Sequence, residues 1–328
     1  MSTAIHTIDE FEYALATGDS IERWSPLSGA PLVAVDLASG HLSPDSFRRL
    51  RLLACPLIGV GHGDADLAAA CDLLADDTAE LEQLAAAITT SPIAALTLVQ
   101  LLRATENLPL EAALNMESLA YATLQSGPEF IRWLELPRTP VEVVAATEPP
   151  VLISRAGTEL EITINRPAQR NAIDVAVRDG LIEALRLAVA DSEVTRVTLS
   201  GAGKCFSIGG ALGEFGSVAG AAQAHAIRSV QLPARWLSWC ADRTTAYLHS
   251  ACIGAGIELP AFAARVVAKK NTFMQLPELA MGLIPGAGGC VSIPRRIGRQ
   301  RTAWLVVSGR RIDATTALQW GLVDELVE

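Results

Sequence analysis

The chain has 328 residues, half of them hydrophobic, and carries a formal net charge of −10. Its hydrophobic content excludes a disordered chain, which needs low hydrophobicity and dense charge. The acidic balance argues against broad binding to nucleic acid, because phosphates attract clustered Lys and Arg. The first twenty residues are acidic and lack an apolar centre, so we predict no signal peptide.

Two further features predict a cytoplasmic protein. The six cysteines are widely scattered, with no CxxC pair and no zinc-like spacing, which favours buried free thiols in a reducing compartment. The most apolar long window, residues 246–268, contains His249, Glu258 and Arg265. Because a membrane span rarely carries such side chains, we interpret this window as buried core and expect no membrane span.

The first zone, residues 1–78, is predicted to be a short α/β segment. Residues 31–37 and 56–61 are apolar runs ended by turn residues, as expected of buried strands. Ser43 precedes a proline and an acid, and this pattern predicts the start of a helix.

The second zone, residues 79–137, is predicted to be helical throughout. Apolar residues recur at helical spacing, and helix starts or breaks are indicated at Ser91-Pro92, Pro109 and Gly127-Pro128. Residues 137–150 contain four prolines and are predicted to be a linker. Residues 1–147 therefore form an N-terminal region, separate from a domain over residues 148–328.

Strands and helices alternate in residues 148–328, which predicts an α/β domain. Residues 160–165 alternate like a half-buried strand, Asp174 is placed to cap a helix reaching residue 190, and residues 194–199 form another strand. Residues 295–311 are rich in Arg. This stretch is either a solvated helix face or a local attraction for a phosphorylated ligand.

Four segments of this domain carry residues suited to catalysis: 165–172, 203–212, 254–259 and 276–289. The glycines at 209, 210, 254 and 256 allow the backbone to approach a ligand closely. Two backbone N–H groups that converge on one oxygen form an oxyanion hole. Glu258 and Glu278 lie in apolar segments, where an isolated carboxylate is costly. Either one alone could be a helix-cap acid or an ion-pair partner, but the two together favour acid/base chemistry.

The order of these segments resembles the crotonase (enoyl-CoA hydratase/isomerase) superfamily. The family pattern is NRP-x-x-x-NA, G-x-G-x-x-FSAG-x-DL, GGG-x-E-L and PE-x-x-x-G-x-IPG-x-GG, and the match spans about residues 150–328. The last two elements match nearly letter for letter, with Glu258 and Glu278 at the family's separation. The resemblance implies a spiral of stacked ββα turns, a homotrimer or homohexamer, and an acyl-CoA substrate without a metal or redox cofactor.

The resemblance also implies roles for individual residues. The backbone N–H groups of Gly210 and Ala255 would form the oxyanion hole for a thioester carbonyl. Glu258 would help to activate water, and Glu278 would exchange the proton at the α-carbon. Candidate CoA-binding residues are Arg170, Lys204 and Ile208, and the alternative for Arg170 and Lys204 is an ordinary solvated side chain. His249, Ser250, Cys290 and Ser292 are interpreted as structural residues.

Hydration of a 2-enoyl-CoA to a 3-hydroxyacyl-CoA is the function that the resemblance favours. A double-bond isomerase is an alternative, although it needs only one base. Ala211 stands where the family usually has Asp, and Ser250 stands where it usually has Gly. The first of these departures, with the unusual N-terminal region, keeps open a catalytically silent acyl-CoA-binding or assembly subunit.

The family normally continues into helices that cover the acyl site and form trimer contacts, whereas the resemblance here ends at residue 326. Residues 79–137 resemble that missing tail in their order of helices, breaks and leucines. We therefore predict that they perform its task from the N-terminal side, in a permuted chain or in the remnant of two fused copies. An unrelated helical domain is the alternative.

Overall fold

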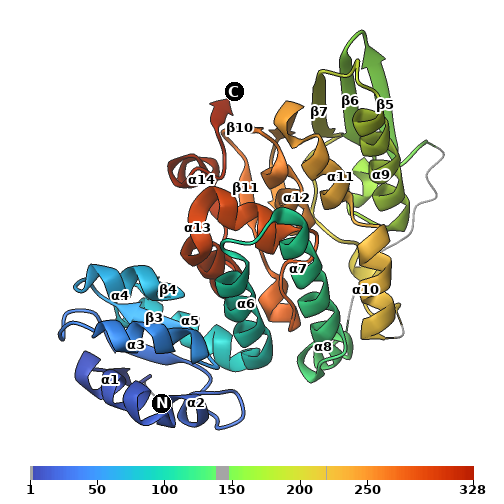
Figure 1. Cartoon of the computed structure of the whole chain (residues 1–328). Coiled ribbons are helices and arrows are strands. Elements are labelled where there is room, and N and C mark those ends of the chain that lie inside the picture. The colour runs from blue at the N-terminus through green and yellow to red at the C-terminus, as the bar shows by residue number, and fades with distance from the viewer. Residues whose placement is uncertain (1–2, 138–147, 219) are drawn as a thin grey trace.

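The computed structural model describes residues 3–137, 148–218 and 220–328. Of the predicted linker, residues 138–147 lie outside the described residues. The N-terminal unit is a parallel sheet in the order β1-β2-β3-β4 with helices packed against it (Figure 1). Its elements are β1 (Ile5–His6), α1 (Ile8–Thr17), α2 (Asp19–Arg23), β2 (Val33–Asp36), α3 (Pro44–Arg49), β3 (Leu57–Val60), α4 (Ala65–Ala70) and β4 (Leu73–Ala75).

Both strands predicted in this unit, and the helix start at Ser43, are confirmed. β2 and β3 are almost wholly buried and pair in parallel, which explains their continuous apolar runs. The Ser43 side chain accepts a hydrogen bond from the Ser46 backbone N–H at the start of α3. The unit has a hydrophobic core of its own, in which Phe11 is fully buried.

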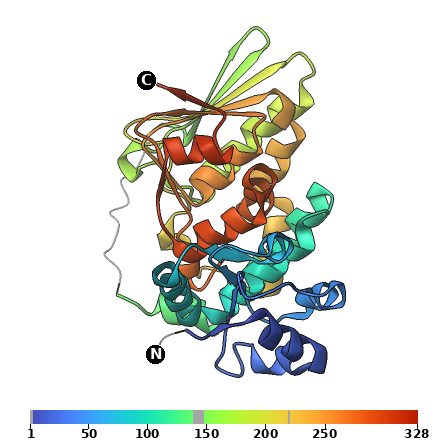
Figure 2. The same ribbon diagram turned by 90° about the vertical axis from the view of Figure 1, so that its left-hand side faces the viewer.

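Four helices connect this unit to the rest of the molecule: α5 (Thr78–Thr90), α6 (Pro92–Thr105), α7 (Leu110–Gln125) and α8 (Pro128–Leu134). Their starts confirm the helix boundaries predicted at Ser91-Pro92, Pro109 and Gly127-Pro128. They lie between the N-terminal unit and the large sheet, and both ribbon views agree on this (Figures 1 and 2). Their buried side chains belong to the same hydrophobic cluster as residues 151–323.

A six-stranded sheet in the order β13-β10-β8-β7-β6-β5 dominates the rest of the described structure. Only the pair β5 and β6 is antiparallel. A smaller sheet has the order β12-β11-β9. The strands are β5 (Val151–Ala156), β6 (Glu159–Ile164), β7 (Arg196–Gly201), β8 (Thr244–Leu248), β9 (Ala251–Ile253), β10 (Arg265–Lys269), β11 (Phe273–Gln275), β12 (Ile312–Asp313) and β13 (Glu325–Val327).

The helices of this part are α9 (Val175–Ala190), α10 (Ala221–Val230), α11 (Pro233–Trp239), α12 (Ala255–Glu258), α13 (Gly289–Ser308) and α14 (Ala314–Trp320). Asp174 caps α9 as predicted, since its side chain accepts a hydrogen bond of 2.7 Å from the Val177 N–H. The strand predicted at 194–199 is β7, which begins two residues later. All six cysteines are buried and free, as expected.

The arginine-rich stretch at 295–311 fixes the N-terminal unit to the core. Arg299 on α13 donates to the backbone carbonyls of Ala69, Ala70 and Cys71, at the end of α4. Arg103 on α6 pairs with Asp72, a buried residue of the N-terminal unit. Arg299 is neither part of a solvated helix face nor free to attract a phosphorylated ligand, the two interpretations that the sequence allowed. Its side chain is largely buried and its N–H groups bind protein oxygens.

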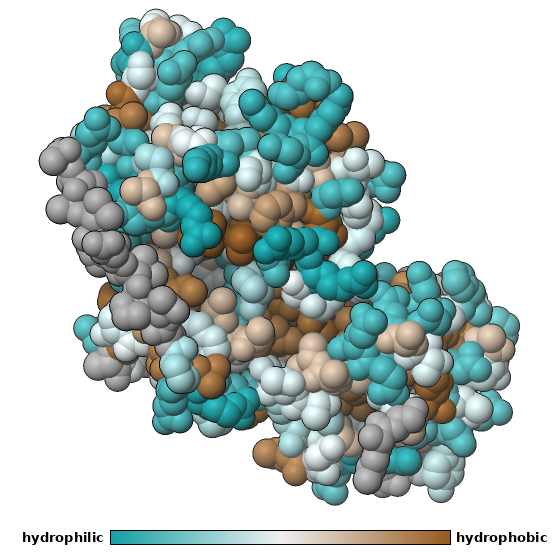
Figure 3. Space-filling model, turned by 180° about the vertical axis from the view of Figure 1, so that it is seen from behind, coloured by the Kyte–Doolittle hydropathy of each residue, from teal (hydrophilic) through white to brown (hydrophobic). Residues whose placement is uncertain are grey.

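Among the described residues, no single helix is long and apolar enough to cross a membrane; α5 and α6 satisfy that test only as a pair bent by 106°. From behind, apolar side chains gather in a recess at the middle of the molecule (Figure 3).

Candidate active site

Two glycine-containing loops lie against each other at the ends of strands. Gly209 has φ +85°, and a Cβ placed on it would lie 2.6 Å from the carbonyl oxygen of Ile253 and 3.4 Å from the backbone N of Ala255. Glycine is therefore required for the two loops to approach this closely. Gly210 and Ala255 both line one cavity. Among the described residues, neither of their N–H groups has a hydrogen-bond acceptor.

Asn171, the second asparagine of the 165–172 segment, connects two loops beside the cavity. Its side chain is fully buried and donates hydrogen bonds of 2.8 to 3.0 Å to the carbonyls of Ala202, Cys205 and Phe206. Its Oδ1 accepts a hydrogen bond from the Arg166 N–H. The residue thus holds the 202–206 loop against the 166–171 loop, which is a structural task.

Glu258 ends the short helix α12, and its side chain is 2% exposed. Its Oε2 accepts hydrogen bonds from the backbone N–H groups of Ala287 at 2.7 Å and Gly289 at 2.9 Å. Burial raises the pKa of Glu258 to about 7, although these N–H donors and the charge of Arg228 act in the opposite direction. The N–H donors of this turn therefore favour the ionised form of a carboxyl group that burial alone would keep protonated.

Glu278 begins a short 3₁₀ helix, Glu278–Met281, and faces Glu258 across Gly254. A Cβ placed on Gly254 would lie 2.6 Å from Oε1 of Glu278 and 3.8 Å from Oε1 of Glu258. Gly254 has φ +51° and ψ −124°, a conformation suited to glycine alone. Oε2 of Glu278 is buried without a hydrogen-bond partner among the described residues. Burial, followed by the charge of Glu258, raises the pKa of Glu278 well above its usual value.

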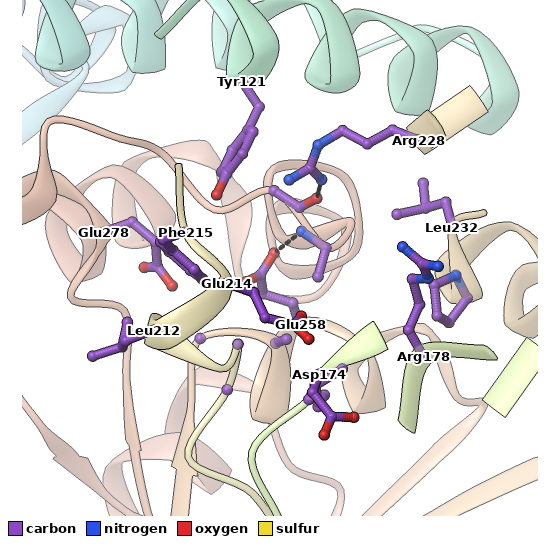
Figure 4. A pocket seen from close by; sticks show the side chains of 18 of the residues that line it. Tyr121, Asp174, Arg178, Leu212, Glu214, Phe215, Arg228, Leu232, Glu258 and Glu278 are labelled. Carbon is purple, nitrogen blue, oxygen red and sulfur yellow. Dashed lines mark hydrogen bonds between the residues drawn. The ribbon is translucent and has the colours of Figure 1, made fainter. Parts of the chain in front are cut away.

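The opposite wall of the cavity comes from α7 and α10 (Figure 4). The Arg228 guanidinium carbon lies 3.8 Å from the centre of the Tyr121 ring, and an Arg228 N–H donates to the Gly286 carbonyl. A Cβ placed on Gly286 would lie 2.2 Å from the Tyr121 ring, so the glycine lets the ring reach this loop. The cavity has a volume of about 260 Å³.

The structure gathers five of the seven predicted site residues around this cavity: Ile208, Gly210, Ala255, Glu258 and Glu278. Arg170 and Lys204 are exposed and are not among the lining residues, although the Arg170 carbonyl accepts a hydrogen bond from the Ile208 N–H. Their predicted contact with CoA stays a prediction. Sequence reasoning assigned no function to Tyr121, Gln125 or Arg228, which also line the cavity.

A family model described as enoyl-CoA hydratase/isomerase matches residues 156–328, slightly more than half of the chain. The chain belongs to this family. Among curated family relatives, it is 34% identical to 2,3-dehydroadipyl-CoA hydratase of Escherichia coli over 176 residues, or 54% of this chain and 68% of the relative. It is 31% identical to carnitinyl-CoA dehydratase of Salmonella enteritidis over 53% of this chain and 67% of that protein. The chain thus spans about two thirds of these relatives.

Solved structures of family members share the fold of the matched part. An enoyl-CoA hydratase from Thermoplasma volcanium aligns with a TM-score of 0.50 and 29% identity, over 55% of this chain and 72% of that chain. The enoyl-CoA hydratase from Bacillus anthracis aligns with a TM-score of 0.50 and 27% identity, over 54% and 70%. The predicted crotonase-type α/β fold is therefore confirmed for this part of the molecule.

Proposed function

We propose that this chain is an enoyl-CoA hydratase, which adds water to a 2-enoyl-CoA to give a 3-hydroxyacyl-CoA. The observation that carries the proposal is the meeting of two buried carboxylates, Glu258 and Glu278, beside Gly254. They lie next to the Ala255 N–H group, which has no acceptor in the described part of the chain. A thioester carbonyl placed between the Gly210 and Ala255 N–H groups would present its enoyl carbons to both acids.

In the proposed reaction, ionised Glu258 accepts a proton from water as the water oxygen bonds to C3. The C2–C3 π electrons move towards C1, and the thioester oxygen takes negative charge opposite the Gly210 and Ala255 N–H groups. Protonated Glu278 then donates its proton to C2, which gives the neutral 3-hydroxyacyl product and leaves Glu258 protonated and Glu278 ionised. Transfer of one proton from Glu258 to Glu278 restores the starting state. Opposite protonation states are favoured for this pair, because burial raises the pKa of both acids and the charge of Glu258 raises that of Glu278 further. No metal or redox cofactor takes part in these steps.

The presence of two facing acids favours hydration over double-bond isomerisation, because moving a proton between two carbons requires one base. Two curated relatives, a hydratase and a dehydratase, are consistent with that choice. A silent acyl-CoA-binding subunit would have no need for a carboxylate such as Glu278, whose buried Oε2 has no partner within the described residues.

We also propose that residues 79–137 take the place of the family's tail. α7 supplies Tyr121 to the cavity wall, and α8 packs closely on the core, since a Cβ on Gly282 would lie 2.6 Å from the Glu129 backbone. An active, soluble and oligomeric fragment lacking residues 1–140 would contradict this role. The cytoplasmic location and the trimeric or hexameric state stay predictions.

Hydration of crotonyl-CoA tests the function, with loss of the enoyl thioester absorbance as the measurement. We expect Glu258→Gln and Glu278→Gln each to lower kcat by about 10²- to 10⁴-fold, as for the loss of a general acid or base. A parallel assay with a 3-enoyl-CoA measures isomerisation. Equal hydration rates in the wild type and Glu278→Gln would exclude the mechanism, whereas isomerisation without hydration would favour the alternative enzyme.

A further inference from the structure

Four consecutive backbone N–H groups at the start of α13 are divided between two buried carboxylates. Glu258 accepts those of Ala287 at 2.7 Å and Gly289 at 2.9 Å. Glu117 on α7 accepts hydrogen bonds from the other two N–H groups, those of Gly288 at 2.7 Å and Cys290 at 2.8 Å. The two acids therefore hold opposite sides of the same turn.

This turn has little room to move. Gly288 has φ +105°, and a Cβ placed on Gly289 would lie 2.5 Å from Cγ of Glu258. Glu117 and Glu258 are 1% and 2% exposed, so bulk solvent does not reach either carboxylate. If the Glu117 acceptor is lost, two buried N–H groups need new partners and the turn must shift. The donors that orient Glu258 belong to the same four residues and would shift too.

We propose that Glu117 is a positioning residue, which holds the 287–290 turn so that Glu258 lies correctly for catalysis. This inference rests on the proposed function of the site and adds a residue from outside the family-matched segment. Tyr121, one helical turn further along α7, packs on Gly286 in the same loop. The helix thus braces both ends of the loop that orients Glu258.

The charged and titratable groups around Glu117 determine how pH enters the test. They come from α7, α10, α12, the 3₁₀ helix at 278–281 and α13: Tyr121, Arg228, Glu258, Glu278 and Cys290. Burial, followed by the charge of Glu258, raises the pKa of Glu117 to about 8. The nearby Glu258 carboxylate thus favours the neutral form of Glu117. Replacement of Glu117 by glutamine then removes little charge but substitutes an NH₂ donor for one acceptor oxygen.

The chain offers a matched control for this substitution. Glu129 on α8 is 6% exposed and accepts the backbone N–H groups of Ile93 at 2.7 Å and Ala94 at 2.9 Å, at the start of α6. Its side chain has the same structural task at a helix start but does not line the cavity. Glu129→Gln thus reproduces the loss of a buried helix-start acceptor, without the link to Glu258.

We expect Glu117→Gln to lower kcat for crotonyl-CoA by about 10- to 100-fold with a smaller change in KM, as for a misplaced catalytic group. The acidic limb of the pH–rate profile should move upwards, because weakened N–H donors stabilise ionised Glu258 less. Glu117→Asp should recover part of the rate. Glu129→Gln should retain the wild-type kcat and the wild-type position of the acidic limb when rates are normalised to folded protein.

The inference would be overturned by a wild-type pH–rate profile in Glu117→Gln. It would also be overturned by equal losses of kcat in Glu117→Gln and Glu129→Gln. Carboxyl ¹³C NMR of glutamate-labelled protein provides a readout that does not depend on activity. The Glu258 resonance is the one that is absent from the spectrum of Glu258→Gln. The pKa of Glu258 should rise in Glu117→Gln and should not change in Glu129→Gln. If the wild type does not hydrate crotonyl-CoA, the proposed function fails while this titration still decides the role of Glu117.

Discussion

Both the N-terminal unit and the core bury carboxylates, but the two sets have different surroundings. In the N-terminal unit, Asp64 accepts three backbone N–H groups at 3.0 to 3.1 Å. Asp72 accepts the Leu57 N–H at 2.8 Å and pairs with Arg103. In the core, Glu278 retains a buried oxygen without a partner among the described residues.

The pKa values of Asp64 and Glu278 differ in the same way. Burial raises the pKa of Asp64, but its backbone N–H donors outweigh this and lower the pKa overall. For Glu278, burial and the charge of Glu258 both raise the pKa. Burial alone therefore does not mark a catalytic acid. The distinguishing feature is an incomplete set of partners inside a cavity, which leaves capacity for a ligand.

The largest effect on stability is expected at Asp72. Asp72→Asn leaves Arg103 and Arg299, each with a side chain 13% exposed, without their buried counter-charge. Breaking such a buried pair typically costs about 3–5 kcal/mol, which urea unfolding would measure. We expect kcat per folded molecule to stay unchanged, because the pair lies outside the cavity. A large fall in kcat at full folding would show that the N-terminal unit influences catalysis directly.

At Glu278 we expect the reverse, with activity lost and stability gained at alkaline pH. Because the folded-state pKa of Glu278 is raised from about 4.5, the folded protein holds a proton that the unfolded chain releases. Its contribution to stability is complete below that unfolded value and is lost as pH rises towards the folded pKa. Each pH unit in this window is worth about 1.4 kcal/mol.

Glutamine does not titrate, so the Tm of Glu278→Gln should exceed the wild-type Tm by more at pH 8 than at pH 5. Thermal melts across this range provide the measurement. A Tm difference that does not change with pH would show that Glu278 titrates as it does in the unfolded chain.

The sequence predicted those parts of the site whose neighbours along the chain carry the signal. Gly254 and Gly256 shortly precede Glu258 in the sequence, and a proline directly precedes Glu278. An apolar, glycine-containing context therefore identified both acids. The helices of residues 78–134 were equally predictable, because apolar periodicity and prolines mark each one.

Residues whose partners are remote in sequence were not predictable in this way. Glu117 and Gly288 are separated by 171 positions, and Arg228 and Gly286 by 58. The only local signal at Glu117 was a carboxylate on the same helix face as the buried Leu114 and Tyr121. Such a residue resembles an ordinary cap or ion-pair acid until the fold brings α13 against it. The arginine-rich stretch was likewise ambiguous until α4 was placed beside Arg299.

The smallest expected effect concerns Arg228 and refines the contrast between the two sets of acids. Its charge is among the groups that lower the pKa of Glu258 against the effect of burial. Arg228→Met removes this charge, so the pKa of Glu258 should rise and the acidic limb of the pH–rate profile should move to higher pH. We expect a shift of about half to one pH unit, below that of a directly paired charge. Arg228→Lys keeps the charge but loses the planar stack on Tyr121, so its limb should stay near the wild-type position. If both variants move the limb equally, the contact with Tyr121 and Gly286 governs Glu258 through geometry, and the acid responds to its loop more than to its counter-charge.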